Sequence, residues 1–63
     1  MNAGERIRVQ QALSPISTRT TEGVYEGQEA CPITHRVCLN VRVSWCQTRL
    51  IDPATITDIQ RLH

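Results

Sequence analysis

Three cysteines and a histidine fall close together in this 63-residue chain, and these residue types bind metals or act as nucleophiles. The stretch CPITHRVC holds Cys31, His35 and Cys38, and Cys46 follows a little later. Four such ligands arranged as a tetrahedron would suit a structural zinc ion. A thiolate beside a histidine base would instead suit covalent catalysis. Both chemistries depend on the elements that hold these residues.

Distance along the chain counts against the zinc interpretation. A straight strand from Cys38 to Cys46 would separate them by ~26 Å, at ~3.3 Å per residue. A shared zinc ion with bonds of ~2.3 Å would require the chain to fold back between them. The sequence also lacks a CxxC pair. We therefore predict three reduced thiols, with no metal and no cofactor.

The nucleophile interpretation is weak as well. His35 and His63 are the only histidines, and histidine is the side chain that titrates near neutral pH. His35 lies three positions from Cys38, and residues three apart on a strand point to opposite faces. A chain of this length also has little room for a closed, dry pocket. We predict that the protein is not an enzyme.

The clearest expected element is a central strand over residues 36–45, RVCLNVRVSW. Hydrophobic and polar residues alternate along it without a break, which is the period of a strand with one buried face. One buried and one wet face favour an antiparallel sheet. The residues expected to face the core are Val37, Leu39, Val41, Val43 and Trp45. Those expected to face solvent are Arg36, Cys38, Asn40, Arg42 and Ser44.

Two further strands precede it. Residues 5–13, ERIRVQQAL, alternate in the same way until Ser14-Pro15 interrupts them. Residues 16–30 follow, and Cys31-Pro32 ends that element because proline has no amide hydrogen for a sheet. Gly23 and Gly27 lie inside it, and a glycine within a strand indicates a bulge, a bend or a close backbone approach.

The tail, TRLIDPATITDIQRLH, permits two readings. Leu50 and Ile51 continue a strand, and Asp52-Pro53 then offers an N-cap with proline at the first helical position. Either one helical turn over residues 53–56 leads into a last strand over 57–62, or the whole tail is a helix. In the helical alternative Ile56, Ile59 and Leu62 share one face. The β-branched residues of the tail favour the strand.

TRLIDPATITDIQRL resembles the way SH3-like barrels close, with a strand, a one-turn helix containing proline and a short strand. GVYEG resembles the bent second strand of the same barrels. The resemblance implies an all-β fold, a small SH3-like or Sm-like barrel of four to five strands, as a single domain over residues 1–63. The expected core is Ile7, Val9, Val24, Val37, Leu39, Val41, Val43, Trp45, Leu50, Ile51, Ile56 and Ile59.

Composition limits the class of protein. Hydrophobic residues make up 40% of the chain and charged residues 21%, which is typical of a foldable globular domain. The net charge of +1 gives no global attraction toward nucleic acid or an anionic membrane. No segment approaches the ~20 apolar residues that span a bilayer. The start, MNAGERIRVQQ, lacks the apolar region of a secretory signal, so we expect a cytoplasmic protein.

One possible binding face can be traced on the polar sides of the strands. All seven basic residues are arginine, whose planar fork suits phosphate or carboxylate. If the first strand and the strand over 36–45 are neighbours, four arginines and two amides would line one surface: Arg6, Arg8, Gln10, Arg36, Asn40 and Arg42. Arginine contacts phosphate, and amides can read a base edge.

Two functions remain open. The first is a small cytosolic regulatory or interaction module, of the kind that phages and plasmids encode as regulators or inhibitors. It would act through protein contacts or self-association, because a small barrel with exposed edges is short of internal stability. The alternative is a nucleic-acid-binding barrel that uses the arginine face. Against it stand the near-zero net charge and the lack of an aromatic platform, since Trp45 has core parity. We expect no membrane partner and no small-molecule substrate.

Overall fold

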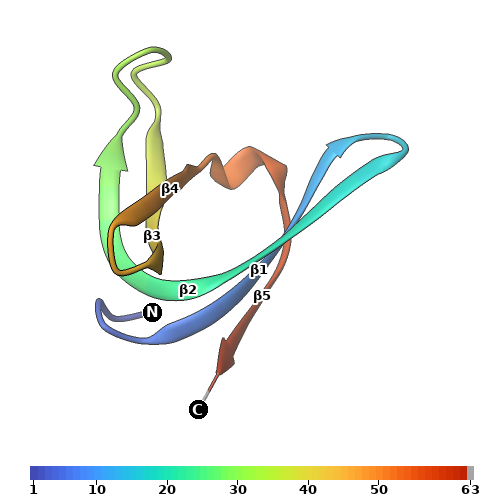
Figure 1. The fold of residues 1–63 in the computed structure, drawn as a ribbon. Helices are drawn as coiled ribbons and strands as arrows, with labels where there is room; N and C mark the ends of the chain where they lie inside the picture. Colours follow the sequence, from blue (N-terminus) through green and yellow to red (C-terminus); the bar gives the residue numbers. More distant parts are fainter. Residues whose placement is uncertain (63) are drawn as a thin grey trace.

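A computed structural model describes residues 1–62, which form one antiparallel sheet of five strands (Figure 1). The strands are β1 (Arg6–Ser14), β2 (Ser17–Ala30), β3 (Val37–Ser44), β4 (Gln47–Ile51) and β5 (Ile56–Leu62). A 3-10 turn, η1 (Pro53–Thr55), joins β4 to β5. The sheet order is β4-β3-β2-β1-β5. The all-β prediction is confirmed, but the sheet is not closed into a barrel: β4 and β5 are its edges.

Strand β2 is the centre of the sheet, not β3 as expected from the sequence. It pairs with β1 along its first half and with β3 along its second half, and it curves strongly between the two (Figure 1). Gly23 directly precedes Val24, the residue of β2 that pairs with both β1 and β3. A Cβ atom there would lie 2.3 Å from the carbonyl oxygen of Arg42 and 2.9 Å from Cγ1 of Val41. Only glycine permits this approach, so the predicted bend of the second strand is confirmed.

The tail follows the first of the two sequence readings. Asp52 is the N-cap of η1, because its Oδ1 accepts a hydrogen bond from the backbone N–H of Ala54 at 3.0 Å. Strand β5 then pairs antiparallel with β1, with Arg6 opposite Leu62. The helical alternative is wrong. Within residues 1–62, no helix has the length and apolar character needed to cross a membrane.

The core lies on one face of the sheet. Its buried members are Ile7, Val9, Tyr25, Leu39, Val41 and Ile51, with Val43 and Ile56 packed against them and partly buried. Tyr25 was not predicted to be a core residue. Its partner across the β2–β3 pairing is Val41, and directly opposed residues share a face of the sheet.

Several predicted core residues lie elsewhere. Val37, Trp45, Leu50 and Ile59 are exposed, and Val24 is only half-buried. Trp45 is exposed because β3 ends at Ser44, which pairs with Gln47, so Trp45 belongs to the turn between them. Val37 lies past the last β3–β4 pair, Leu39 with Ile51, where β4 no longer covers it. The alternation therefore fails to predict burial where neighbouring strands are missing: Trp45 lies outside β3, and Val37 is paired only with Ala30 of β2.

Candidate functional site

The loop over residues 31–36 joins β2 to β3 and holds itself together. The backbone N–H of Cys31 donates to the carbonyl of Arg36, and the N–H of His35 donates to the carbonyl of Cys31, both at 2.8 Å. His35 has a φ of 60°, in the left-handed region that histidine tolerates better than most residues. The side chain of Arg36 reaches Asp52 at 3.3 Å. These hydrogen bonds connect the loop to itself, and the ion pair connects it to Asp52, the N-cap of η1.

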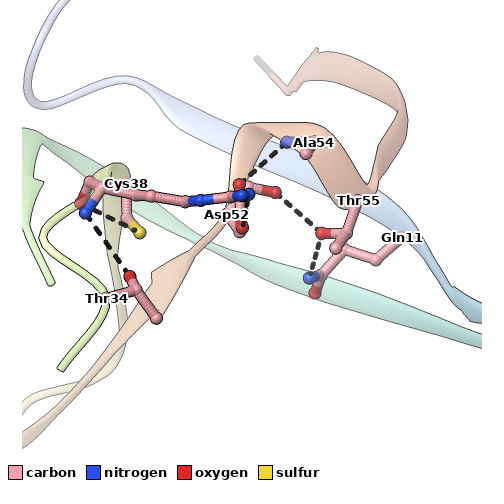
Figure 2. A network of polar contacts seen from close by, with 7 residues as sticks. Gln11, Thr34, Cys38, Asp52, Ala54 and Thr55 are labelled. Atoms are coloured by element: carbon pink, nitrogen blue, oxygen red, sulfur yellow. Dashed lines mark hydrogen bonds and ion pairs between the residues drawn. The ribbon is translucent and has the colours of Figure 1, made fainter.

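Cys38 was expected to face solvent, and this is wrong. Its side chain is only 5% exposed, and its thiol donates to the carbonyl of Arg36 at 3.7 Å. Figure 2 shows Cys38 beside Thr34, with Asp52 on its other side. The loop and the Arg36–Asp52 pair cover that end of β3. Strand parity does not foresee such a cover, because it comes from residues outside the strand.

The three thiols have different surroundings. The N–H and hydroxyl of Thr34, followed by the N–H of Ile33, lower the pKa of Cys31 by hydrogen bonding to its sulfur. Burial, followed by the nearness of Cys31 and Asp52, raises the pKa of Cys38. Cys46 lies at the other end of β3, with its sulfur 3.9 Å from the hydroxyl of Ser44. Within residues 1–62, no three His, Cys, Asp or Glu side chains are grouped as a metal site.

Asp52 is the centre of a polar network that ties η1 to the sheet (Figure 2). Besides capping Ala54, its backbone carbonyl accepts from the hydroxyl of Thr55 at 2.7 Å. The oxygen of that hydroxyl accepts in turn from Nε2 of the buried Gln11 at 2.9 Å. These contacts join β1, η1 and the β2–β3 loop. The network is therefore a structural joint, although Oε1 of the buried Gln11 has no hydrogen-bond partner among residues 1–62.

The opposite end of β3 carries an open hollow of about 420 Å³, which we call the arginine hollow. Its lining residues are Arg6, Glu22, Gly23, Val24, Arg42, Val43, Ser44 and Trp45. They come from β1, from the curve of β2, from the end of β3 and from the β3–β4 turn. The indole of Trp45 is 91% exposed. An aromatic surface therefore lies beside two guanidinium groups.

The register of the sheet brings Arg6 and Arg42 together. Arg6 is opposite Val24, and Val24 is opposite Arg42, so the two arginines flank β2 on the face away from the core. Neighbouring strands lie ~4.8 Å apart, which puts the two backbones about 10 Å from each other. The sequence predicted a shared arginine face for β1 and β3 if they were neighbours. The structure brings their side chains to one hollow with β2 between them.

The charges around the hollow are unequal. Arg8 is paired with Glu22 at 2.6 Å and also donates to Gln60 at 3.2 Å. Nε of Arg42 lies 2.9 Å from Oε1 of Glu26. Among residues 1–62, Arg6 has no ion-pair partner. Of the two guanidinium groups that line this hollow, that of Arg6 is therefore the one without a carboxylate partner among the described residues.

The six residues of the predicted binding face are divided by the fold. Arg6 and Arg42 line the hollow. Arg8 and Gln10 continue along β1 on the same face, but Arg8 is neutralised by Glu22. Nδ2 of Asn40 donates to Glu29 at 3.1 Å, and Arg36 lies outside β3 on Asp52.

Sequence reasoning missed Trp45 as a member of this site. The turn Trp45-Cys46 contains no glycine, asparagine or aspartate, the residues that usually indicate a two-residue hairpin. Nothing in the alternating pattern therefore separates Trp45 from the buried residues before it.

A second hollow of about 300 Å³ borders the first. It is lined by Gly4, Glu5, Arg6, Arg61 and Leu62, so Arg6 belongs to both. Arg6 is therefore shared by the arginine hollow, which Trp45 also lines, and by the hollow at the end of β5. No protein-family model, curated protein or solved structure matches the chain. The geometry of the described residues thus carries the functional argument.

Proposed function

We propose that the protein is a small binding module for single-stranded nucleic acid and that the arginine hollow is its contact site. The observation that carries this proposal is the exposed indole of Trp45 beside Arg6 and Arg42. Proteins that bind single strands combine aromatic side chains, on which bases stack, with basic groups that follow the backbone. The lack of an aromatic platform counted against this function at the level of sequence, and Trp45 supplies one.

The shape of the site supports an extended ligand. Arg6 lies between the two hollows, and Arg61 lines the outer one. A base on Trp45 would leave the next phosphate groups along a path toward Arg6, whose guanidinium suits phosphate oxygens. The net charge of +1 supplies little long-range steering, so affinity must come from these local contacts.

The proposal includes an assignment of the fold to the SH3-like class. The succession of β4, a one-turn η1 begun by Asp52-Pro53, and β5 supports it. The strong curve of β2 at Gly23, where the strand passes from one half of the sheet to the other, supports it as well. This architecture hosts many functions, so the functional proposal depends on the hollow alone.

The test is a fluorescence-anisotropy titration of labelled 12-nucleotide strands, oligo(dT) and oligo(U), with the protein at several salt concentrations. We expect binding that weakens as salt rises, with a logarithmic slope of about −0.7 for each phosphate neutralised. Arg42→Ala and Arg6→Ala should flatten the slope, whereas Arg36→Ala, outside the hollow, should leave it unchanged. Absence of binding at low salt, or equal effects of Arg36→Ala and Arg42→Ala, would refute the proposal.

A second candidate function is contact with protein, and it has its own observation. Ile16 is 98% exposed at the β1–β2 turn, and Ile33 is 86% exposed in the β2–β3 loop. Strands β4 and β5 also each have a free edge, which can pair with a strand of another chain. These features occupy separate corners of the molecule and form no single patch. Native mass spectrometry tests self-association: a dimer that Ile16→Ser or Ile33→Ser abolishes would support it, and a monomer at every concentration would oppose it.

A further inference from the structure

A β-bulge places an acidic side chain against Arg42 in the hollow. Tyr25 is opposite Val41 and Gly27 is opposite Asn40, so Glu26 is an extra residue on β2. Gly27 has a φ of 115°, a conformation that side chains disfavour. Bulges of this kind redirect a side chain. Here the redirected group is the carboxylate of Glu26, whose Oε1 lies 2.9 Å from Nε of Arg42.

This ion pair is accessible and therefore easily exchanged. The side chain of Arg42 is 48% exposed and that of Glu26 is 34% exposed. Pairs this exposed contribute little, because water and salt screen them. A ligand anion arriving at Arg42 meets a guanidinium that already has a negative partner. Arg6, in the same hollow, has no such partner among residues 1–62.

We propose that Glu26 is an internal competitor for the phosphate groups of the ligand and thereby sets the affinity of the hollow. In the empty site Glu26 neutralises Arg42. When a phosphate binds, the carboxylate must leave Arg42 or remain beside a second anion, and both alternatives weaken binding. The inference rests on the proposed function in one respect, that the ligand carries phosphate.

The substitution Glu26→Gln removes the charge and keeps the size of the side chain. We expect it to tighten binding of the single-stranded 12-mers about two- to fivefold. It should also steepen the logarithmic salt slope, by less than about 0.7, because Arg42 then no longer shares its charge between Glu26 and the phosphate. A purely structural role of Glu26 would not change that slope.

Glu29→Gln is the matched control. Glu29 lies on the same strand and carries the same charge, but its contact is Asn40 at 3.1 Å, not an arginine of the hollow. At 0.1 M salt the Debye length is about 10 Å, so the charge of Glu29 has little effect on groups farther away than that. A gain for Glu26→Gln alone supports the inference. Equal gains for both variants, or no gain for Glu26→Gln, would overturn it.

Two measurements separate this inference from the proposed function. In an Arg42→Gln background, Glu26→Gln should bring no gain in affinity if it acts through Arg42, and a persistent gain would contradict the competitor role.

A titration with inorganic phosphate tests the anion site without nucleic acid. The NMR signals of Arg42 Nε–H and Trp45 Nε1–H report whether phosphate binds. If oligonucleotides bind no variant but phosphate shifts these signals more in Glu26→Gln than in the wild type, the inference stands and the proposed function falls. If phosphate shifts neither protein, the inference falls as well.

Discussion

At its N-terminal end β3 continues from the loop of residues 31–36, and at its C-terminal end it enters the turn of Trp45 and Cys46. The loop contains cysteine, histidine and threonine, and its backbone N–H groups at Cys31, His35 and Arg36 and the guanidinium of Arg36 have partners within the loop or on Asp52. The turn contains an indole that contacts solvent over most of its surface and lies beside arginine.

The difference shows that residue type is a poor guide to a binding site until the partners of each residue are known. Cys38 and Asp52 are reactive types, yet one is buried and the other caps η1. Trp45 is a typical core type, yet it is available to a ligand. The two ends of β3 differ in whether the functional groups already have hydrogen-bond or ion-pair partners within the protein.

The largest expected effect concerns the curve of β2 beneath the arginine hollow. Gly23→Ala would place a Cβ atom 2.3 Å from a backbone oxygen of β3, and a backbone cannot move aside as a long side chain can. We expect a loss of about 3 kcal/mol in the free energy of unfolding, measured with urea. Gly27→Ala is the control, because its Cβ would meet open space and would suffer only the positive φ, at about 1–2 kcal/mol. Equal losses would show that close approach at Gly23 is unimportant.

Trp45→Ala should affect binding without affecting folding. Removing a stacking side chain lowers affinity for a single strand by about 1–3 kcal/mol, which is about 5- to 150-fold. The free energy of unfolding should change by less than about 0.5 kcal/mol, since the side chain is outside the core. Tyr25→Ala provides the contrast, because Tyr25 is buried and its loss should cost about 3–5 kcal/mol. A comparable loss of stability for Trp45→Ala would place Trp45 in the core after all.

At the other end of β3, the cap should matter more than the ion pair. Asp52→Ala removes the acceptor for the Ala54 N–H and should cost about 1 kcal/mol. Arg36→Ala removes only an exposed pair with the same aspartate and should cost no more than about 0.5 kcal/mol. Urea midpoints of the two variants give the comparison. A larger effect of Arg36→Ala would mean that the loop is fastened mainly by charge.

The smallest effect is a difference between two thiols of one loop. Hydrogen bonds from Thr34 and Ile33 lower the pKa of Cys31, so its thiolate is populated at lower pH than that of an ordinary cysteine. Burial raises the pKa of Cys38, which should therefore react slowly with iodoacetamide until higher pH. Peptide mass spectrometry across a pH series measures both rates. Thr34→Val should move the Cys31 profile to higher pH, and an unchanged profile would contradict the role of the Thr34 hydroxyl.

The amino-acid sequence by itself determined the local structure. Alternation along residues 6–14 and 37–44 specified strands, glycine marked the bend of β2, and Asp52-Pro53 began η1. These features depend on backbone preferences and on a period of two, which act between residues close in the chain. The separation of Cys38 from Cys46 followed from the same local geometry.

Only the tertiary structure decided which residues meet. Tyr25 is buried because the β2–β3 register puts it opposite Val41, and Trp45 is exposed because the β3–β4 pairing ends at Ser44 and Gln47. The meeting of Arg6 with Arg42 depends on a register shared by three strands, and the pairing of Arg42 with Glu26 depends on one inserted residue. Such contacts join residues far apart in the chain. Because local preference carries no information about register, the sequence predicted a shared surface for Arg6 and Arg42 only on the condition that their strands are neighbours, and it did not place Trp45 beside them.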